Sequence, residues 1–275
     1  MAVERMATSP NGAAIQTRLF AGPRSITYRR LVVIAHPLGR LGGSWDDAVV
    51  GAVTAALSSC DVVQFNSRGV GKSTGSATFT CVHACVAPSD APAARARSRI
   101  IKRSSITTSS SQPATSTRMK SSSASCVDRL VAHDLTWQGY SAGSMAASLA
   151  RGPKQMIQQR HVLISYPVSV LWALTVGHTA AFNAGLDALV ADNSSDVLEI
   201  HGSGDTFTSA SKYASWASAL QAKATTSGSR FQSIEVPGAG HFWTDGALVW
   251  PTLADLAGTA RLLANHISTW LALSN

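Results

Sequence analysis

Residues 137–150 read WQGYSAGSMAASLA, and the middle of this stretch decides how the rest of the chain is interpreted. Residues 139–143, GYSAG, follow the pattern G-x-S-x-G and lie between a short strand-like run and an alanine-rich helical run. A serine on such a turn is exposed at the end of a strand, and the small residues around it let strand and helix approach closely. The free N–H groups of the helix would then face negative charge that develops beside Ser141. By itself the pattern also fits an ordinary strand-to-helix turn.

Short apolar runs alternate with helical patterns on both sides of this stretch. The strand candidates are rich in β-branched and aliphatic residues; they are 31–36, 61–66, 135–138, 161–166, 196–201 and 231–236. The helical patterns cover 46–57, 144–150, 182–190, 210–223 and 253–273. This alternation predicts a mainly parallel sheet with helices on both faces, in a single α/β domain over residues 1–275. Functional residues of such sheets collect at the carboxyl ends of the strands.

Two later strand candidates are followed by an acid and a histidine, the residue types that activate a serine nucleophile. The run DVLEIH leads into GSGD, so Asp205 follows a strand, and the run FQSIEV leads into PGAGHFW, so His241 follows the next one. Serine, acid and histidine occur in this order in hydrolases built on such a sheet. We predict that Ser141 is the nucleophile, that His241 moves its proton, and that Asp205 fixes the imidazole tautomer. The alternative for Asp205 is a turn or helix-cap residue.

The loop after the first strand candidate has the composition of an oxyanion loop. Residues 36–43 read HPLGRLGG, and the glycines allow this loop to fold tightly under the nucleophile. We predict that the backbone N–H groups of Leu38 and Ala142 stabilise the oxyanion. The alternative is that His36-Pro37 only terminates a strand.

Apolar and aromatic residues near the predicted strand ends indicate what a pocket would hold. Trp172, Phe242 and Trp243 are the predicted lining residues, together with the loop PVSVLWALTVGHTA at 167–180. Such a lining favours a small apolar acyl or alcohol group. The alternative is that the two tryptophans are core residues. Roughly fifteen residues separate the run 161–166 from the next helical pattern, so we expect no large cap.

Composition and cysteine usage narrow the class of protein. The 275 residues are 45% hydrophobic and 14% charged, which is typical of a globular protein, and no apolar run is long enough to span a membrane. The N-terminal residues lack the apolar core of a secretory signal, so a cytoplasmic location is expected. Two of the four cysteines flank a histidine in Cys81-Val-His83-Ala-Cys85, a spacing tighter than that of zinc sites. We expect no disulfide framework, no metal and no cofactor.

The formal charge of +8 is concentrated in one segment. Seven basic residues and one acid lie within 87–125, and the remaining chain is close to balanced, so no nucleic-acid partner is expected. The surrounding segment 81–126 is rich in serine and has no apolar periodicity. It is predicted to be a low-complexity, disordered insertion. A shifted reading frame or a retained intron would produce the same abrupt loss of pattern.

The stretch 66–73, NSRGVGKS, resembles the end of a nucleotide-binding P-loop but departs from its pattern. The pattern G-x-x-x-x-G-K-[ST] requires glycine at position 66, which is Asn66, and the residues TGSATFT that follow do not begin a helix. Nucleotide binding is therefore disfavoured. The stretch is predicted to be a glycine-rich turn near the rim of the site.

These residues together resemble the α/β-hydrolase superfamily, and more closely its small, nearly capless serine esterases and peptidase-like members, including uncharacterised fungal proteins. The resemblance covers roughly 31–80 and 137–273. It rests on AHPLGRLGGSWDD (35–47), FNSRGVGKSTG (65–75), GYSAGS (139–144), ISYPVSVLWALT (164–175), HGSGD (201–205) and PGAGHFW (237–243). It implies the α/β-hydrolase fold and a Ser-His-Asp hydrolase carried by Ser141, His241 and Asp205.

The activity implied by the resemblance is hydrolysis of a small carboxylic ester or thioester through an acyl-enzyme, as in carboxylesterases. A serine peptidase or amidase is an alternative within the same chemistry. The chain departs from the family after RGVGKSTG, where relatives have an amphipathic helix and residues 81–126 have none. A hydrolase-fold binding protein, inactive because this segment displaces the serine turn, is therefore a further alternative.

Overall fold

The computed structural model describes residues 2–9, 11–23, 30–76, 134–152, 159–244 and 258–273. The segment 81–126, predicted to be a disordered insertion, lies outside the described residues, as does the cysteine–histidine cluster within it. The strands are β1 (Ala2–Thr8), β2 (Ala14–Phe20), β3 (Arg30–Ala35), β4 (Asp61–Phe65), β5 (Asp134–Tyr140), β6 (Gln159–Ile164), β7 (Ser195–Gly202) and β8 (Arg230–Val236).

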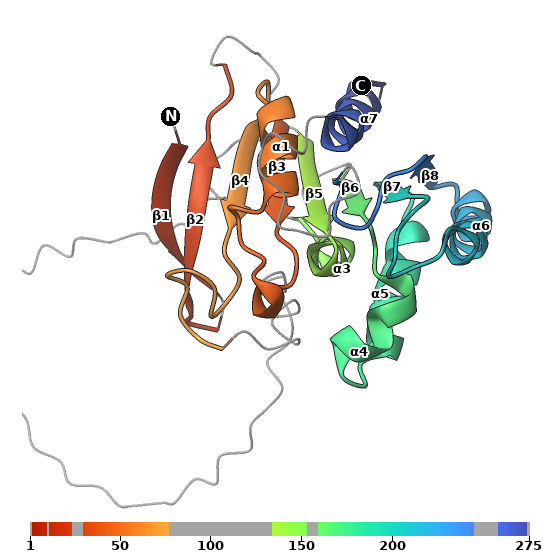
Figure 1. Cartoon of the computed structure of the whole chain (residues 1–275), viewed down its shortest axis with the longest axis horizontal. Coiled ribbons are helices and arrows are strands. Elements are labelled where there is room, and N and C mark those ends of the chain that lie inside the picture. The colour runs from red at the N-terminus through yellow and green to blue at the C-terminus, as the bar shows by residue number, and fades with distance from the viewer. Residues whose placement is uncertain are drawn as a thin grey trace, which may run out of the picture.

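Over the described part of the chain these strands form one sheet in the order β1-β2-β4-β3-β5-β6-β7-β8 (Figure 1). The pairs β1–β2 and β2–β4 are antiparallel, and the other five pairs are parallel. Every residue of β6 and β7 is buried, as expected for central strands that are covered on both faces. The predicted mainly parallel sheet is therefore confirmed.

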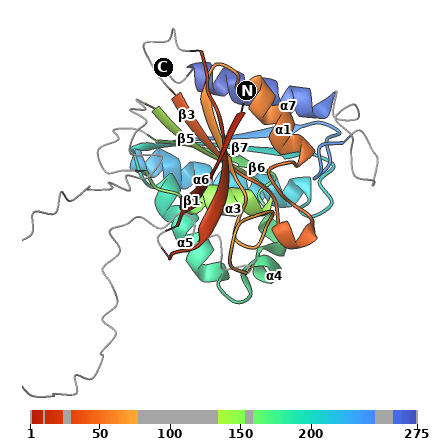
Figure 2. The same ribbon diagram turned by 90° about the vertical axis from the view of Figure 1, so that its left-hand side faces the viewer.

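Helices cover both faces of the sheet (Figure 2). On one face lie α1 (Ala48–Ala56) and α7 (Thr259–Leu273), which pack on apolar residues of the sheet such as Val32 and Ile200. The other face is covered by α3 (Ala142–Leu149), α5 (Thr179–Val190) and α6 (Ala210–Ser227). Besides α5, residues 167–194 hold only the short helices η2 (Val168–Val170) and α4 (Leu171–Thr175), so no large cap covers the strand ends.

The hairpin of β1 and β2 was not expected from the sequence. Ala2 pairs with Phe20 and Thr8 with Ala14, which places this hairpin at one edge of the sheet. Six of the seven residues of β1 are exposed, and charged residues interrupt its apolar ones. A solvent-exposed edge strand has no continuous apolar run, and such a run was the signal by which the other strands were recognised.

The strand β5 is longer than the predicted 135–138 and lies at the centre of the sheet. Thr136 and Gln138 are buried within it although they are polar. At its start, Asp134 accepts a hydrogen bond of 2.6 Å from Arg30 Nε and forms an ion pair with Arg160. Neighbouring strands thus supply the charges that let a carboxylate be buried there, because an unpaired buried charge is costly.

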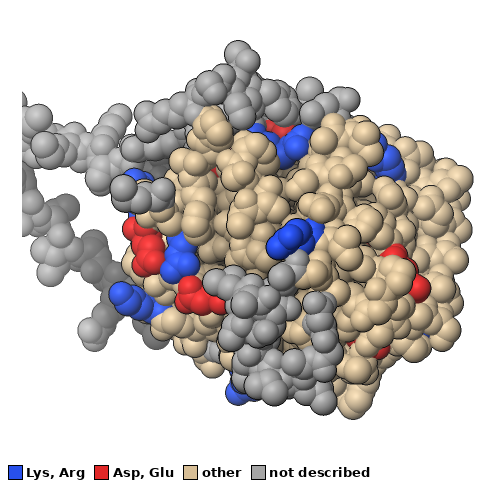
Figure 3. Space-filling model, turned by 45° about the horizontal axis from the view of Figure 1, so that its top comes forward, with Lys and Arg blue, Asp and Glu red and all other residues tan. Residues whose placement is uncertain are grey.

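Charged side chains are sparse on the face of the molecule shown in Figure 3, where basic residues stand alone or beside acids. No helix in the described ranges is both long and apolar enough to cross a membrane.

Candidate active site

Ser141 lies on a sharp turn between β5 and α3. Its backbone has φ 53° and ψ −120°, a conformation that residues other than glycine adopt only at an energetic cost. A Cβ on Gly139 would lie 2.0 Å from the carbonyl oxygen of Gly143, and a Cβ on Gly143 would lie 2.3 Å from that of Ala35. Both glycines of the motif are therefore required for the close approach of β5, α3 and β3.

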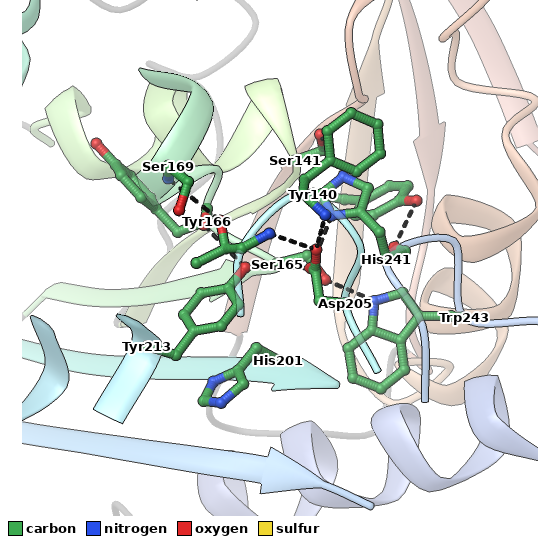
Figure 4. Close-up of polar contacts among 12 residues, drawn as sticks. Tyr140, Ser141, Ser165, Tyr166, Ser169, His201, Asp205, Tyr213, His241 and Trp243 are labelled. Atoms are coloured by element: carbon green, nitrogen blue, oxygen red, sulfur yellow. Dashed lines mark hydrogen bonds and ion pairs between the residues drawn. The ribbon is translucent and has the colours of Figure 1, made fainter. Parts of the chain in front are cut away.

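Of the three residues predicted to act together, His241 lies between the other two and within hydrogen-bonding distance of each (Figure 4). His241 Nε2 is 3.0 Å from Ser141 Oγ, and His241 Nδ1 is 2.7 Å from Asp205 Oδ2. Ser141 follows β5, Asp205 follows β7 and His241 follows β8, so three strand ends build this arrangement. It matches the geometry in which an imidazole accepts a proton from a hydroxyl while a carboxylate orients it.

The environment of Asp205 keeps its carboxylate ionised. Burial acts to raise the pKa of Asp205, but the hydrogen bond and charge of His241, with further backbone hydrogen bonds, outweigh it and lower the pKa. Asp205 Oδ1 accepts hydrogen bonds from the N–H groups of Phe207 (2.8 Å) and Thr208 (3.0 Å). The hydroxyl of Tyr213 lies 3.2 Å from Oδ2. The carboxylate is thus held in place and available to stabilise an imidazolium.

Two aromatic residues hold the loop that carries His241. The hydroxyl of Tyr140, the residue before Ser141, donates a hydrogen bond of 3.0 Å to the carbonyl oxygen of His241. The indole N–H of Trp243 donates to Ser165 Oγ at 3.0 Å, and both of these side chains are fully buried. Sequence analysis missed Tyr140, because it occupies a variable position of G-x-S-x-G and nothing in the pattern indicates its partner.

Both predicted oxyanion donors belong to residues close to Ser141 in the chain or in the pocket lining. Ala142 is the first residue of α3, and Leu38 lines the same pocket as Ser141. No hydrogen bond between described residues uses the N–H of Leu38 or that of Ala142. Both donors therefore remain available to a bound oxygen.

The loop at 37–43 is braced by the buried side chain of His36. Burial lowers the pKa of His36 to about 4, so the imidazole is neutral near pH 7. Its Nδ1 is 2.5 Å from the carbonyl oxygen of Pro37, and its Nε2 accepts a hydrogen bond of 2.9 Å from the N–H of Ser67. The glycine-rich turn that resembles the end of a P-loop is therefore joined, through Ser67, to the residue that precedes the loop at 37–43.

A cavity of about 280 Å³ opens beside Ser141. Its walls are formed by the loop at 37–43, the start of α1, the end of β5, the segment from η2 to α4, and the turns after β7 and β8. The lining includes Leu38, Leu41, Asp46, Asp47, Tyr140, Val170, Leu174, Phe207, His241 and Phe242. Apolar side chains dominate these walls, as is typical of small-ligand sites.

The prediction for the pocket residues needs correction at two of three positions. Phe242 lines the cavity as predicted, but Trp243 has no exposed surface and belongs to the core, where its indole N–H binds Ser165 Oγ. Trp172 lies on α4 with 70% of its surface exposed and does not line the cavity. Phe207 does line it, and sequence analysis missed this residue, since nothing marked the turn after Asp205 as part of a pocket wall.

The charged side chains of the cavity are acidic. Asp46 and Asp47 lie on its wall, whereas the described lining contains no Lys or Arg. Asp46 forms an ion pair of 3.1 Å with Arg18, outside the cavity. Burial raises the pKa of Asp47, and hydrogen bonds from the N–H groups at the start of α1 partly offset this effect. In the parts of the chain that the structure describes, no group of three or more His, Cys, Asp or Glu has the arrangement of a metal site.

No protein family model and no curated protein matches this chain. Solved structures match nearly all of it. An α/β serine hydrolase homologue from Coxiella burnetii is 19% identical with a TM-score of 0.56, over 96% of this chain and 97% of that one. An α/β serine hydrolase without a lid from Xanthomonas campestris is 16% identical with a TM-score of 0.56, over 98% and 94%. Est1E from Butyrivibrio proteoclasticus, solved with ferulic acid bound, is 13% identical with a TM-score of 0.60, over 98% of both chains. The chain therefore has the α/β-hydrolase fold with a minimal cap.

Proposed function

We propose that this protein is a serine hydrolase that cleaves small carboxylic esters through an acyl-enzyme. The observation that carries the proposal is the hydrogen-bonded chain from Ser141 Oγ through the His241 imidazole to the Asp205 carboxylate, with steps of 3.0 and 2.7 Å. The strained turn at Ser141 supports it, because such strain persists where it serves a function. The fold shared with solved serine hydrolases supports it as well.

The proposed reaction has two halves. In the first, Ser141 Oγ attacks the ester carbonyl carbon while its proton passes to His241 Nε2, and the N–H groups of Leu38 and Ala142 stabilise the oxyanion. The C–O bond to the alcohol then breaks, and His241 returns the proton to the departing alcohol. In the second half, water attacks the acyl carbon with His241 as the base, the acid leaves, and the proton returns to Ser141 Oγ.

The cavity supports a small, uncharged and largely apolar substrate. Its volume of about 280 Å³ is at the lower end of small-ligand pockets. Its described lining contains no Lys or Arg that would pair with a negatively charged group. Est1E, which is similar in fold, was solved with the aromatic acid ferulic acid bound. Thioesters share the same acyl chemistry and belong to the proposed substrate range.

Labelling with a fluorophosphonate probe tests this proposal. We expect one equivalent of probe to bind the folded protein and none to bind the Ser141→Ala variant, because the probe requires an activated serine. Hydrolysis of a p-nitrophenyl ester should be lost in the same variant, and the matching p-nitroanilide distinguishes ester from amide cleavage. A folded protein that neither labels nor hydrolyses any ester of a short-chain panel would contradict the proposal and favour a binding protein on this fold.

A further inference from the structure

Two partly exposed aromatic rings flank the predicted base. The ring centroid of Phe207 is 4.4 Å from that of His241, and the centroid of Phe242 is 5.4 Å from it in an edge-on arrangement. The two phenylalanine rings are 5.9 Å apart and nearly perpendicular. Phe207 is 37% exposed and Phe242 is 49% exposed, and both line the cavity beside Ser141. The rings therefore present apolar surface to whatever occupies the cavity.

The backbones of Phe207 and Phe242 are held in place by hydrogen bonds of neighbouring residues in the site. The N–H of Phe207 donates to Asp205 Oδ1 at 2.8 Å, so this residue cannot move without disturbing the carboxylate. Phe242 lies between His241, whose carbonyl oxygen accepts the Tyr140 hydroxyl, and Trp243, whose indole is anchored in the core. Preorganised aromatic surface of this kind is the form that binding sites for apolar groups take.

The chemistry of ester cleavage determines which part of a substrate meets these rings. In the tetrahedral intermediate on Ser141, the oxyanion points to the N–H groups of the oxyanion loop and of α3. The leaving oxygen must lie within about 3 Å of His241 Nε2 to receive its proton. The alcohol group attached to that oxygen consequently emerges beside the imidazole, where Phe207 and Phe242 stand.

We propose that Phe207 and Phe242 form the binding surface for the alcohol portion of the substrate and select esters of aromatic alcohols. This inference rests on the proposed esterase function. Contact between aromatic rings contributes beyond the burial of apolar area, by an amount that corresponds to about a two- to tenfold preference over a saturated ring of similar size.

Two matched pairs of esters test the inference. Benzyl and cyclohexylmethyl butyrate place an aromatic or a saturated ring on the alcohol side, with alcohols of similar reactivity. Methyl phenylacetate and methyl cyclohexylacetate place the same rings on the acyl side. The kcat/KM ratio within each pair is measured for the wild-type protein, for Phe207→Leu, for Phe242→Leu and for Leu41→Ala. The last variant removes apolar surface from the oxyanion loop and serves as the control.

We expect a benzyl preference of about two- to tenfold in the wild type, and its reduction towards unity in each Phe→Leu variant. Leu41→Ala should keep that preference whatever its effect on the absolute rates. Thermal unfolding of each variant shows that it is folded.

A wild-type ratio near unity on the alcohol pair, or a ratio that both Phe→Leu variants leave unchanged, overturns the inference while ester hydrolysis itself stands. If the Phe→Leu variants changed the kcat/KM ratio of the acyl pair alone, the two rings would bind the acyl group instead. Absence of turnover on all four esters, together with absence of labelling, overturns the proposed function and this inference with it.

Discussion

At the scale of single residues, the link between Tyr140 and His241 connects the predicted base to the strand that carries the nucleophile. Burial, followed by the charges of Asp47 and Asp205, raises the pKa of Tyr140 well above its usual value, so its hydroxyl is protonated and can donate at neutral pH. The acceptor is the backbone of His241 rather than its ring. The hydrogen bond therefore positions the imidazole and takes no part in proton transfer.

Tyr140→Phe should lower kcat on an ester substrate by about fivefold and leave KM nearly unchanged, because one hydrogen bond that fixes the base is worth about 1 kcal/mol. Steady-state kinetics on a p-nitrophenyl ester measure both parameters. The control is Tyr166→Phe, which also removes a buried hydroxyl, but one that lies beside the Ser148 side chain rather than the backbone of His241. Equal losses in the two variants would show that the effect is general destabilisation rather than positioning.

The proximity of Ser141, Asp205 and His241 could be predicted from the sequence, and the residues that surround them could not. Ser141, Asp205 and His241 each follow a recognisable apolar run, and parallel strands bring their carboxyl ends to one edge of the sheet. Phe207 and Tyr140 act through spatial contacts that no spacing rule reports. Trp243 follows the pocket residue Phe242 in the sequence, but its side chain lies in the core, and no pattern in the sequence separates the two positions.

At the scale of elements, the start of α1 forms part of the pocket wall, and Asp47 determines where that helix begins. Its Oδ1 accepts hydrogen bonds from the N–H groups of Val49 (2.9 Å) and Val50 (3.3 Å), so Asp47 is the N-cap. The helix is one of the two that cover its face of the sheet among the described residues, and it packs on α7. A loose first turn would therefore disturb both the core and the cavity.

Asp47→Ala should lower the free energy of unfolding by about 1 kcal/mol, since the cap is lost, and the midpoint of thermal unfolding by about 2–4 °C. Asp47→Asn should stay within a few tenths of a kcal/mol of the wild type, because asparagine is an equally good N-cap. Chemical denaturation at neutral pH measures both. If asparagine destabilised the protein as much as alanine does, the charge rather than the cap would be the stabilising feature.

The order of elements was largely predictable, but the edge hairpin and the length of β5 were not. The central strands β6 and β7 carry apolar runs because helices cover both of their faces, and such runs indicate buried strands. The hairpin of β1 and β2 has no such run. In β5 the buried polar residues Thr136 and Gln138 interrupt the pattern, and Asp134 depends on arginines from two neighbouring strands. Partners that lie far apart in the sequence cannot be recognised from a single segment.

At the scale of the whole molecule, two buried neutral histidines connect stability to pH. His161 is fully buried under α3, and its Nδ1–H donates to the carbonyl oxygen of Ala147 at 2.8 Å. Burial lowers the pKa of His161 to about 3 and that of His36 to about 4. In the unfolded chain both have pKa values near 6.5. Between the folded and the unfolded pKa values, the unfolded state binds more protons than the folded state. The contribution of these histidines to the free energy of unfolding is therefore fully present above about pH 6.5 and is lost as the pH drops towards 4.

When the pH is lowered from 7 to 5, each histidine should therefore reduce the free energy of unfolding by about 2 kcal/mol. This amount follows because pH 5 lies about 1.5 units below the unfolded pKa, and each unit corresponds to about 1.4 kcal/mol. His161→Asn keeps an N–H donor near Ala147 and cannot be protonated, so its loss of stability over the same interval should be smaller by about 2 kcal/mol. Urea denaturation of both proteins at pH 7 and pH 5 measures this difference. His266→Asn makes the same exchange at a partly exposed position of α7 and serves as the matched control for the substitution itself. If His161→Asn lost as much stability as the wild type, protonation of some other group would account for the sensitivity to acid.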